Sequence, residues 1–260
     1  MPQQAGFNLA LSPPRRFIGD LLHFAKQIPS VPVQRRLNVR RVAEARAAAS
    51  PRPSWCAVFT RAYALVTRAW PQLRQSYLSF PTPHLYQHPS SVASIAVERE
   101  YGGETAVFFT HLANVERRPL AELDATIRRY KDAPLKSVTS FRRTLLLARV
   151  PSPLRRLLWW VGLNTSGRRR ARLFGTFGVS VYAGLGAASL HPLSVLTTTL
   201  NYGVIDRAGD VDVRLVYDHR VLDGATVARA LADLECVLNH EILTELRGCG
   251  SFDSTEYGVV

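Results

Sequence analysis

The feature that most constrains the fold is a predicted strand, tight turn and helix close to the C-terminus. Residues 211–217 alternate between apolar and polar side chains, which is typical of a strand with one buried face. His219 and Asp223 follow, four residues apart, and Gly224 then permits a tight entry into a helix predicted over 225–243. An imidazole held at a strand end can accept a proton from an incoming thiol, hydroxyl or amine, so this turn is the first candidate for a catalytic site.

The rest of the chain predicts helices and strands in mixed order. The predicted helices cover 14–27, a short segment ending at Ala49, 55–70 with Ser54 as N-cap, and 120–130. The predicted strands cover 31–39, 85–87, 91–98, 105–112, 176–182 and 194–205. Because helices lie between strands that need not be parallel, we expect an α+β fold. We expect residues 1–260 to form one domain, with a flexible tail over 247–260.

Composition indicates a cytoplasmic globular protein. With 260 residues, 47% of them apolar, the chain can bury a sizeable core. It has no run of about 18 apolar residues that would span a membrane, and its N-terminus lacks the pattern of a signal peptide. Cys56, Cys236 and Cys249 are too few and too scattered for a disulfide framework or a zinc site. We therefore expect reduced thiols and no bound metal.

The net charge of +13 comes mainly from one region. No Asp or Glu occurs from Ala133 to Ile205, whereas ten Lys and Arg residues do. Phosphorylated cofactors, anionic lipid surfaces and nucleic acid are the partners that such a region can attract. No helix-turn-helix, zinc-finger or RNA-recognition signature is present, so we do not expect nucleic-acid binding.

Several motifs resemble one enzyme family. Residues 218–224 read Asp-His-Arg-Val-Leu-Asp-Gly, which resembles the Asp-His-Arg-x-x-Asp-Gly signature of the acyltransferase catalytic domain of 2-oxo acid dehydrogenase complexes. Chloramphenicol acetyltransferase, which has the same fold, carries a His-x-x-x-Asp-Gly variant. Further short segments resemble segments of the family and occur in the same order along the chain, at 15–19, 28–32, 62–73, 117–123, 175–180 and 191–195. The resemblance implies a chloramphenicol-acetyltransferase-like sandwich of a mixed sheet and flanking helices.

The resemblance also implies roles for particular residues. His219 would be the general base, and Ser180 would stabilise the oxyanion of the tetrahedral intermediate. Asp223 would orient the turn and pair with Arg15 or Arg16, because a buried carboxylate needs such a partner. In the family, three subunits pack around an axis, and the serine and histidine meet across their interface. The implied state is a homotrimer or a multiple of it.

Asp218 and Arg220 flank the predicted base and are expected to be structural, as is Gly224 at the start of the next helix. The implied reaction moves an acyl group from a thioester, acyl-coenzyme A or an acyl carrier, to a small or lipid-like acceptor. Acyl-coenzyme A would be a cosubstrate rather than a tightly bound cofactor, and no residue is assigned to its phosphates. The alternatives are a non-catalytic trimeric scaffold and a membrane-surface binding module of the same fold.

The largest departure from the family is a basic helical insertion at about 131–174. Its leucines, arginines and paired Trp159 and Trp160 suit a helix that lies on an anionic membrane surface through residues 140–172, at the inner face of the membrane. A helical hairpin packed on the protein body, with the tryptophans in the core or a subunit contact, would give the same pattern. The third interpretation is a cap over a pocket for an apolar acyl or acceptor chain.

Overall fold

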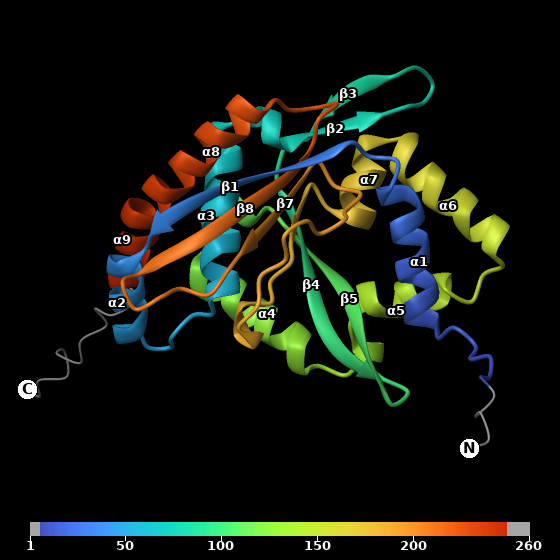
Figure 1. Ribbon diagram of the computed structural model, residues 1–260, viewed down its shortest axis with the longest axis horizontal. Coiled ribbons are helices and arrows are strands. Elements are labelled where there is room, and N and C mark those ends of the chain that lie inside the picture. Colours follow the sequence, from blue (N-terminus) through green and yellow to red (C-terminus); the bar gives the residue numbers. More distant parts are fainter. Residues whose placement is uncertain (1–5, 249–260) are drawn as a thin grey trace, which may run out of the picture.

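A six-stranded mixed sheet forms the centre of the protein (Figure 1). The structure, a computed structural model, describes residues 6–248. The strand order is β1-β8-β7-β6-β4-β5. The strands are β1 (Ser30–Asn38), β4 (Val92–Tyr101), β5 (Glu104–Ala113), β6 (Phe177–Val179), β7 (Thr198–Tyr202) and β8 (Asp210–Asp218). Strand β6 runs parallel to β4 and β7, and the other neighbours are antiparallel.

Helices flank this sheet on both sides. They are α1 (Pro13–Ala25), α2 (Arg40–Ala48), α3 (Trp55–Ala69), α4 (Leu120–Asp132), α5 (Thr139–Leu147), α6 (Ser152–Asn164), α7 (Gly167–Phe174), α8 (Gly224–Val237) and α9 (Leu243–Gly248). Figure 1 shows α2, α3, α8 and α9 beside β1 and β8, and α1, α5, α6 and α7 at the other side of the molecule, beyond β5. This arrangement confirms the predicted α+β fold with a mixed sheet.

The main core lies between one face of the sheet and helices α3 and α8. Tyr63 of α3, Phe108 of β5, Phe177 of β6 and Leu231 of α8 are all buried in it. Helix α3 begins where the sequence predicts, because the Ser54 hydroxyl accepts a hydrogen bond from the Ala57 amide at 3.2 Å. Each large apolar side chain buried here contributes roughly 1.5–3 kcal/mol relative to exposure, so this core fixes the position of the central strands.

A second, smaller core joins α1 to the predicted insertion. Phe17 and Phe24 of α1 pack against the buried Trp159 of α6, with ring centroids 5.1 and 5.8 Å apart. Arg155 of α6 pairs with the buried Asp20 of α1. The segment 131–174 therefore packs on the protein body. This packing does not support the membrane-surface interpretation, and Trp159 is an interior residue.

Within the described residues, no helix combines the length and the apolar character needed to cross a membrane. Two strands are shorter than predicted, since β6 ends at Val179 and β7 begins only at Thr198. The chain between them leaves the sheet, with a short 3₁₀ turn at Ala183–Leu185. The hairpin of β2 (Gln75–Leu78) and β3 (His84–Gln87) contains a first strand that the sequence pattern missed. Most of the predicted tail, including Cys249, lies outside the described residues.

Candidate active site

His219 lies in the turn directly after β8. Its backbone amide donates to the Pro29 carbonyl at 3.0 Å, which ties the turn to the start of β1. The side chain is 49% exposed, so it does not face the packed interior. Its Nδ1 lies 3.0 Å from the Leu222 carbonyl oxygen. Because a carbonyl can only accept, Nδ1 must donate, and a neutral ring then leaves the Nε2 lone pair free to take a proton.

An ion pair between the buried Asp218 and Arg220 fixes the same turn. Asp218 is buried and accepts hydrogen bonds from the Arg220 backbone amide at 3.0 Å, from its Nε at 2.9 Å and from its Nη2 at 2.7 Å. The Arg220 guanidinium lies over the Tyr77 ring, 4.3 Å from its centroid. Three charge-assisted bonds between residues two apart hold the backbone on either side of His219. The geometry is consistent with the structural role expected for Asp218.

Asp223 does not occupy the buried position that the sequence predicted. Its carboxylate is 86% exposed and lies 3.9 Å from His219 Nδ1. Over residues 6–248, no arginine lies within ion-pair distance of it. Arg16 instead donates to the Leu11 carbonyl at 2.9 Å, and Arg15 lines a cavity that contains Ser180. The expected pairing of Asp223 with Arg15 or Arg16 therefore does not form within this chain, because the carboxylate points into solvent at the start of α8.

Gly224 allows α8 to begin close to β8. A Cβ atom at this position would lie 3.3 Å from the Tyr217 hydroxyl oxygen, which is tighter than ordinary contact. The Tyr217 ring in turn contacts His219, with centroids 5.5 Å apart. The glycine thus keeps the tyrosine, the histidine and the helix start together, which agrees with the structural role expected for it.

Ser180 directly follows β6 and is level with the middle of β4 and of β8. Its backbone amide donates to the Leu200 carbonyl at 3.1 Å, and its own carbonyl accepts from the Asn201 side-chain amide. The Ser180 hydroxyl has no hydrogen-bond partner among the described residues. A hydroxyl that is held by a fixed backbone and left without a partner beside a cavity can donate to a ligand.

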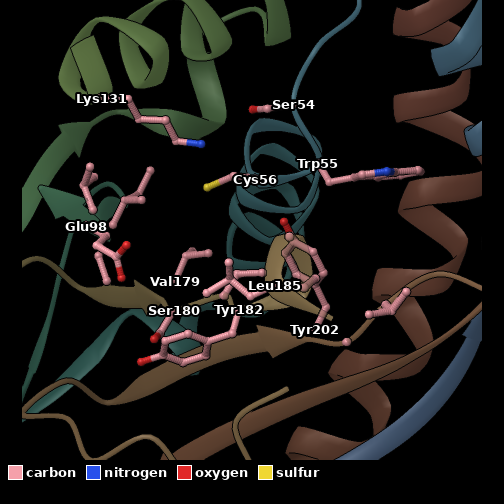
Figure 2. A pocket seen from close by; sticks show the side chains of 18 of the residues that line it. Ser54, Trp55, Cys56, Glu98, Lys131, Val179, Ser180, Tyr182, Leu185 and Tyr202 are labelled. Atoms are coloured by element: carbon pink, nitrogen blue, oxygen red, sulfur yellow. The ribbon is translucent and has the colours of Figure 1, made fainter. Parts of the chain in front are cut away.

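Two cavities meet at Ser180. Figure 2 shows the first, of 620 Å³, which Cys56, Glu98, Lys131 and Tyr202 also line. There the Lys131 ammonium and the Cys56 thiol point toward each other. Burial raises the pKa of the Cys56 thiol, with the Lys131 charge opposing it, so burial favours the protonated form of this thiol. No sequence pattern indicated Glu98, Lys131 or Tyr202, because they lie far apart in the chain, on β4, α4 and β7.

The second cavity lies between Ser180 and α1. It has a volume of 470 Å³, and Arg15 and Ile18 of α1, Ser94 of β4 and Leu196 line it together with Ser180. The two cavities share Ala96, Glu98, Val107, Val179, Ser180 and Tyr182. The serine hydroxyl can therefore be reached from two directions.

Ser180 and His219 lie far apart within one chain. Ser180 is level with Asn201 of β7, which pairs with Arg214 of β8. His219 comes five residues beyond Arg214, which corresponds to about 17 Å along β8, and two strand spacings add about 10 Å across the sheet. Neither cavity at Ser180 includes His219. One copy of the chain thus keeps the two candidate residues about 20 Å apart.

Two other histidines differ sharply from His219. Burial lowers the pKa of His88 and of His111 to about 4, and nearby arginines act in the same direction. His88 also shares a hydrogen bond of 2.9 Å with the Ser76 hydroxyl. Both rings are neutral at pH 7, and the His88 ring is buried whereas the His111 ring is partly buried. The part of the chain that the structure describes contains no group of three or more His, Cys, Asp or Glu side chains that could hold a metal ion.

Comparisons with known proteins establish the fold. No family model and no curated protein matches the sequence. Among solved structures, the dihydrolipoamide acetyltransferase of Azotobacter vinelandii is 16% identical with a TM-score of 0.64, covering 92% of this chain and 94% of that one. A catalytic core of the 2-oxoacid dehydrogenase complex from Thermoplasma acidophilum is 19% identical with a TM-score of 0.64, covering 90% and 99%. Chloramphenicol acetyltransferase is 13% identical with a TM-score of 0.51, covering 88% and 96%. This chain shares the fold of these acetyltransferases, as the sequence motifs predicted.

Proposed function

We propose that this protein is an acyltransferase that moves an acyl group from acyl-coenzyme A to a small or lipid-like acceptor, with its active site between two copies of the chain. The observation that carries the proposal is the His219 ring, whose Nδ1 donates to the Leu222 carbonyl and whose Nε2 is free. This tautomer is the one that a general base needs. The fold shared with acetyltransferase cores supports the same class of reaction.

The reaction needs one proton acceptor and one oxyanion donor. His219 Nε2 takes the proton of the acceptor, whose freed lone pair attacks the thioester carbonyl carbon. The carbonyl oxygen becomes an oxyanion and accepts a hydrogen bond from the Ser180 hydroxyl. When the carbon–sulfur bond breaks, the thiolate leaves and takes the proton from the imidazolium. The products are the acylated acceptor and a free thiol.

The position four residues after the base offers further support. The catalytic mechanism of the Azotobacter vinelandii enzyme has been investigated at a serine, a histidine and an asparagine, and the last two are four residues apart. In this chain Asp223 stands four residues after His219, and its carboxylate lies 3.9 Å from the imidazole. We assign Asp223 the role of positioning the ring rather than of transferring a proton.

The distance between Ser180 and His219 supports a site that two copies form together. A head-to-tail contact that brings the Ser180 end of one chain to the His219 end of another closes into a ring when its rotation matches a symmetry axis. We propose a ring of three, the arrangement that the sequence resemblance implied. The exposed His219 ring and the partner-free Ser180 hydroxyl would then face each other across each contact.

The direct test is release of coenzyme A thiol from acyl-coenzyme A in the presence of candidate acceptors. The proposal predicts thiol release that depends on the acceptor and saturates with the donor. If no acyl-coenzyme A supports turnover with any amine, hydroxyl or thiol acceptor, while light scattering shows the ring, the fold serves as a scaffold and the enzymatic proposal is wrong.

A further inference from the structure

Helices α5, α6 and α7 enclose an apolar cavity of 450 Å³ against β4 and β5. Phe17 of α1, Phe109 of β5, Leu147 of α5, and Trp159 and Val161 of α6 are among the residues that line it. Cavities of about 300–1,000 Å³ with mainly apolar walls are typical of small-molecule sites. Figure 1 shows these helices gathered with α1 beside β5, so the predicted insertion builds most of this wall.

Part of this wall is open to water. Leu158 of α6 and Leu173 of α7 line the cavity and are 46% and 37% exposed. The exposed Arg143, Arg169 and Arg172 line it as well. Arginine stems can add apolar contact surface while their charged ends remain in water. Covering such a wall with a hydrocarbon is favourable, since apolar surface is removed from water.

The apolar cavity borders the cavity beside Ser180. The two share Leu21, Ser94, Phe109, Ser194 and Leu196. Ser180 is level with Ala96, because Val179 pairs with Ile95. Ser94 is therefore only about 7 Å away along β4. A molecule whose carbonyl lies at Ser180 can extend from there past Ser94 to Trp159.

We propose that this cavity holds the hydrocarbon chain of the acyl group, so that the substrates are medium- and long-chain acyl thioesters; this inference rests on the proposed function. The acyl chain is bonded to the carbonyl carbon whose oxygen would contact Ser180. The chain therefore begins within reach of Ser94, which both cavities share. The sulfur and the attacking atom of the acceptor are bonded to the same carbon and extend from it in other directions.

The kinetic test uses saturated acyl-coenzyme A donors from acetyl to hexadecanoyl. Burying one methylene contributes enough free energy to raise kcat/KM about fourfold, so the value should rise by this factor per carbon until the cavity is full. A value that stays flat or falls beyond acetyl would overturn the inference.

Two variants narrow the cavity, and a third serves as a matched control. Val161→Phe on α6 and Thr144→Phe on α5 should each lower the ratio of kcat/KM for dodecanoyl-coenzyme A to that for acetyl-coenzyme A by tenfold or more. Val150→Phe places the same phenylalanine between α5 and α6, outside the cavity, and should leave the ratio unchanged. An unchanged ratio in both cavity variants, or an equal loss in the control, would contradict the inference.

A binding test that needs no turnover separates this inference from the proposed function. Trp159 lies in the cavity wall, so 11-bromoundecanoic acid should quench its fluorescence in a saturable manner, in the wild type and in His219→Ala alike. The Trp159→Phe variant should lose that quenching. Saturable quenching in a protein that shows no turnover would support the hydrocarbon-binding cavity and contradict the proposed acyltransferase function. Equal quenching in wild type and Trp159→Phe would contradict the hydrocarbon-binding cavity.

Discussion

The C-terminal ends of β8 and β6 present the two candidate residues in opposite ways. At the end of β8, His219 sits on an exposed turn that backbone bonds and the Asp218–Arg220 pair hold rigid. At the end of β6, Ser180 lies between two cavities, and its hydroxyl has no partner among residues 6–248. The first strand end offers an imidazole outside both cavities, and the second offers cavities that no histidine lines. Neither strand end of a single copy therefore brings the proposed base and the proposed oxyanion donor together.

The largest effect is expected at the exposed end. Replacing His219 with Ala removes the proposed general base, and kcat should fall about 10²–10⁴-fold. Steady-state thiol release measures the change. His240→Ala is the matched control. This histidine is exposed, and within residues 6–248 its ring forms one hydrogen bond, to the Cys236 carbonyl in the preceding helical turn. A full rate in His219→Ala would show that the exposed end takes no part in catalysis.

The cavity end should show the next largest effect. Ser180→Ala removes one oxyanion donor, and kcat should fall about 10²–10³-fold, whereas KM should change little. Ser180→Thr keeps a hydroxyl at the same position and should recover part of the loss. Equal losses in both variants would mean that the Ser180 hydroxyl does not stabilise the oxyanion.

The free energy of unfolding should decrease in acid because of the partly buried His111. The pKa of His111 is about 4 in the folded protein because of burial, compared with about 6.5 for an ordinary histidine. The unfolded chain therefore binds the extra proton first, so this contribution is complete above pH 6.5 and is lost as the pH falls toward 4. Urea unfolding should show a loss of up to about 3 kcal/mol over this range that His111→Gln lacks. Identical pH profiles would contradict the assignment.

Asp223 should give the smallest effect. Its exposed carboxylate lies 3.9 Å from the imidazole, and exposed ion pairs contribute roughly 0.2–1 kcal/mol. Asp223→Asn should therefore change kcat by no more than about fivefold, measured at several salt concentrations. A loss as large as that of His219→Ala would show that the carboxylate becomes buried when the two ends meet.

Much of the fold could be predicted from the sequence. Alternation over 211–217, the Ser54 cap and the helical spacing of α3 and α8 depend on local preferences, which are legible in one chain. The predicted bounds of β6 and β7 were too long, because apolar residues continue past Val179 while the backbone leaves the sheet. Strand β2 was missed because four residues between prolines carry little periodicity.

The candidate site could be predicted only in part. The motif at 218–224 identified His219 and its neighbours, since these residues are adjacent in sequence. The partners of Ser180 could not be found, because Glu98, Lys131 and Tyr202 reach the cavity through strand register and helix packing. The Asp223 ion pair was wrong for a similar reason, as it depended on the position of α1 relative to α8. The sequence around Trp159 is compatible with three environments for this side chain, and only the packing of α1 against α6 distinguishes them.

The most direct measurement combines two inactive variants. Equal amounts of His219→Ala and Ser180→Ala chains are denatured, mixed and refolded together, and thiol release is compared with that of each variant refolded alone. If the site forms between copies, about one in three contacts of each mixed ring joins an intact histidine to an intact serine. Since about three quarters of the rings are mixed after random assembly, about a quarter of the wild-type rate should return. Mixed rings that remain as inactive as the separate variants would contradict a shared site.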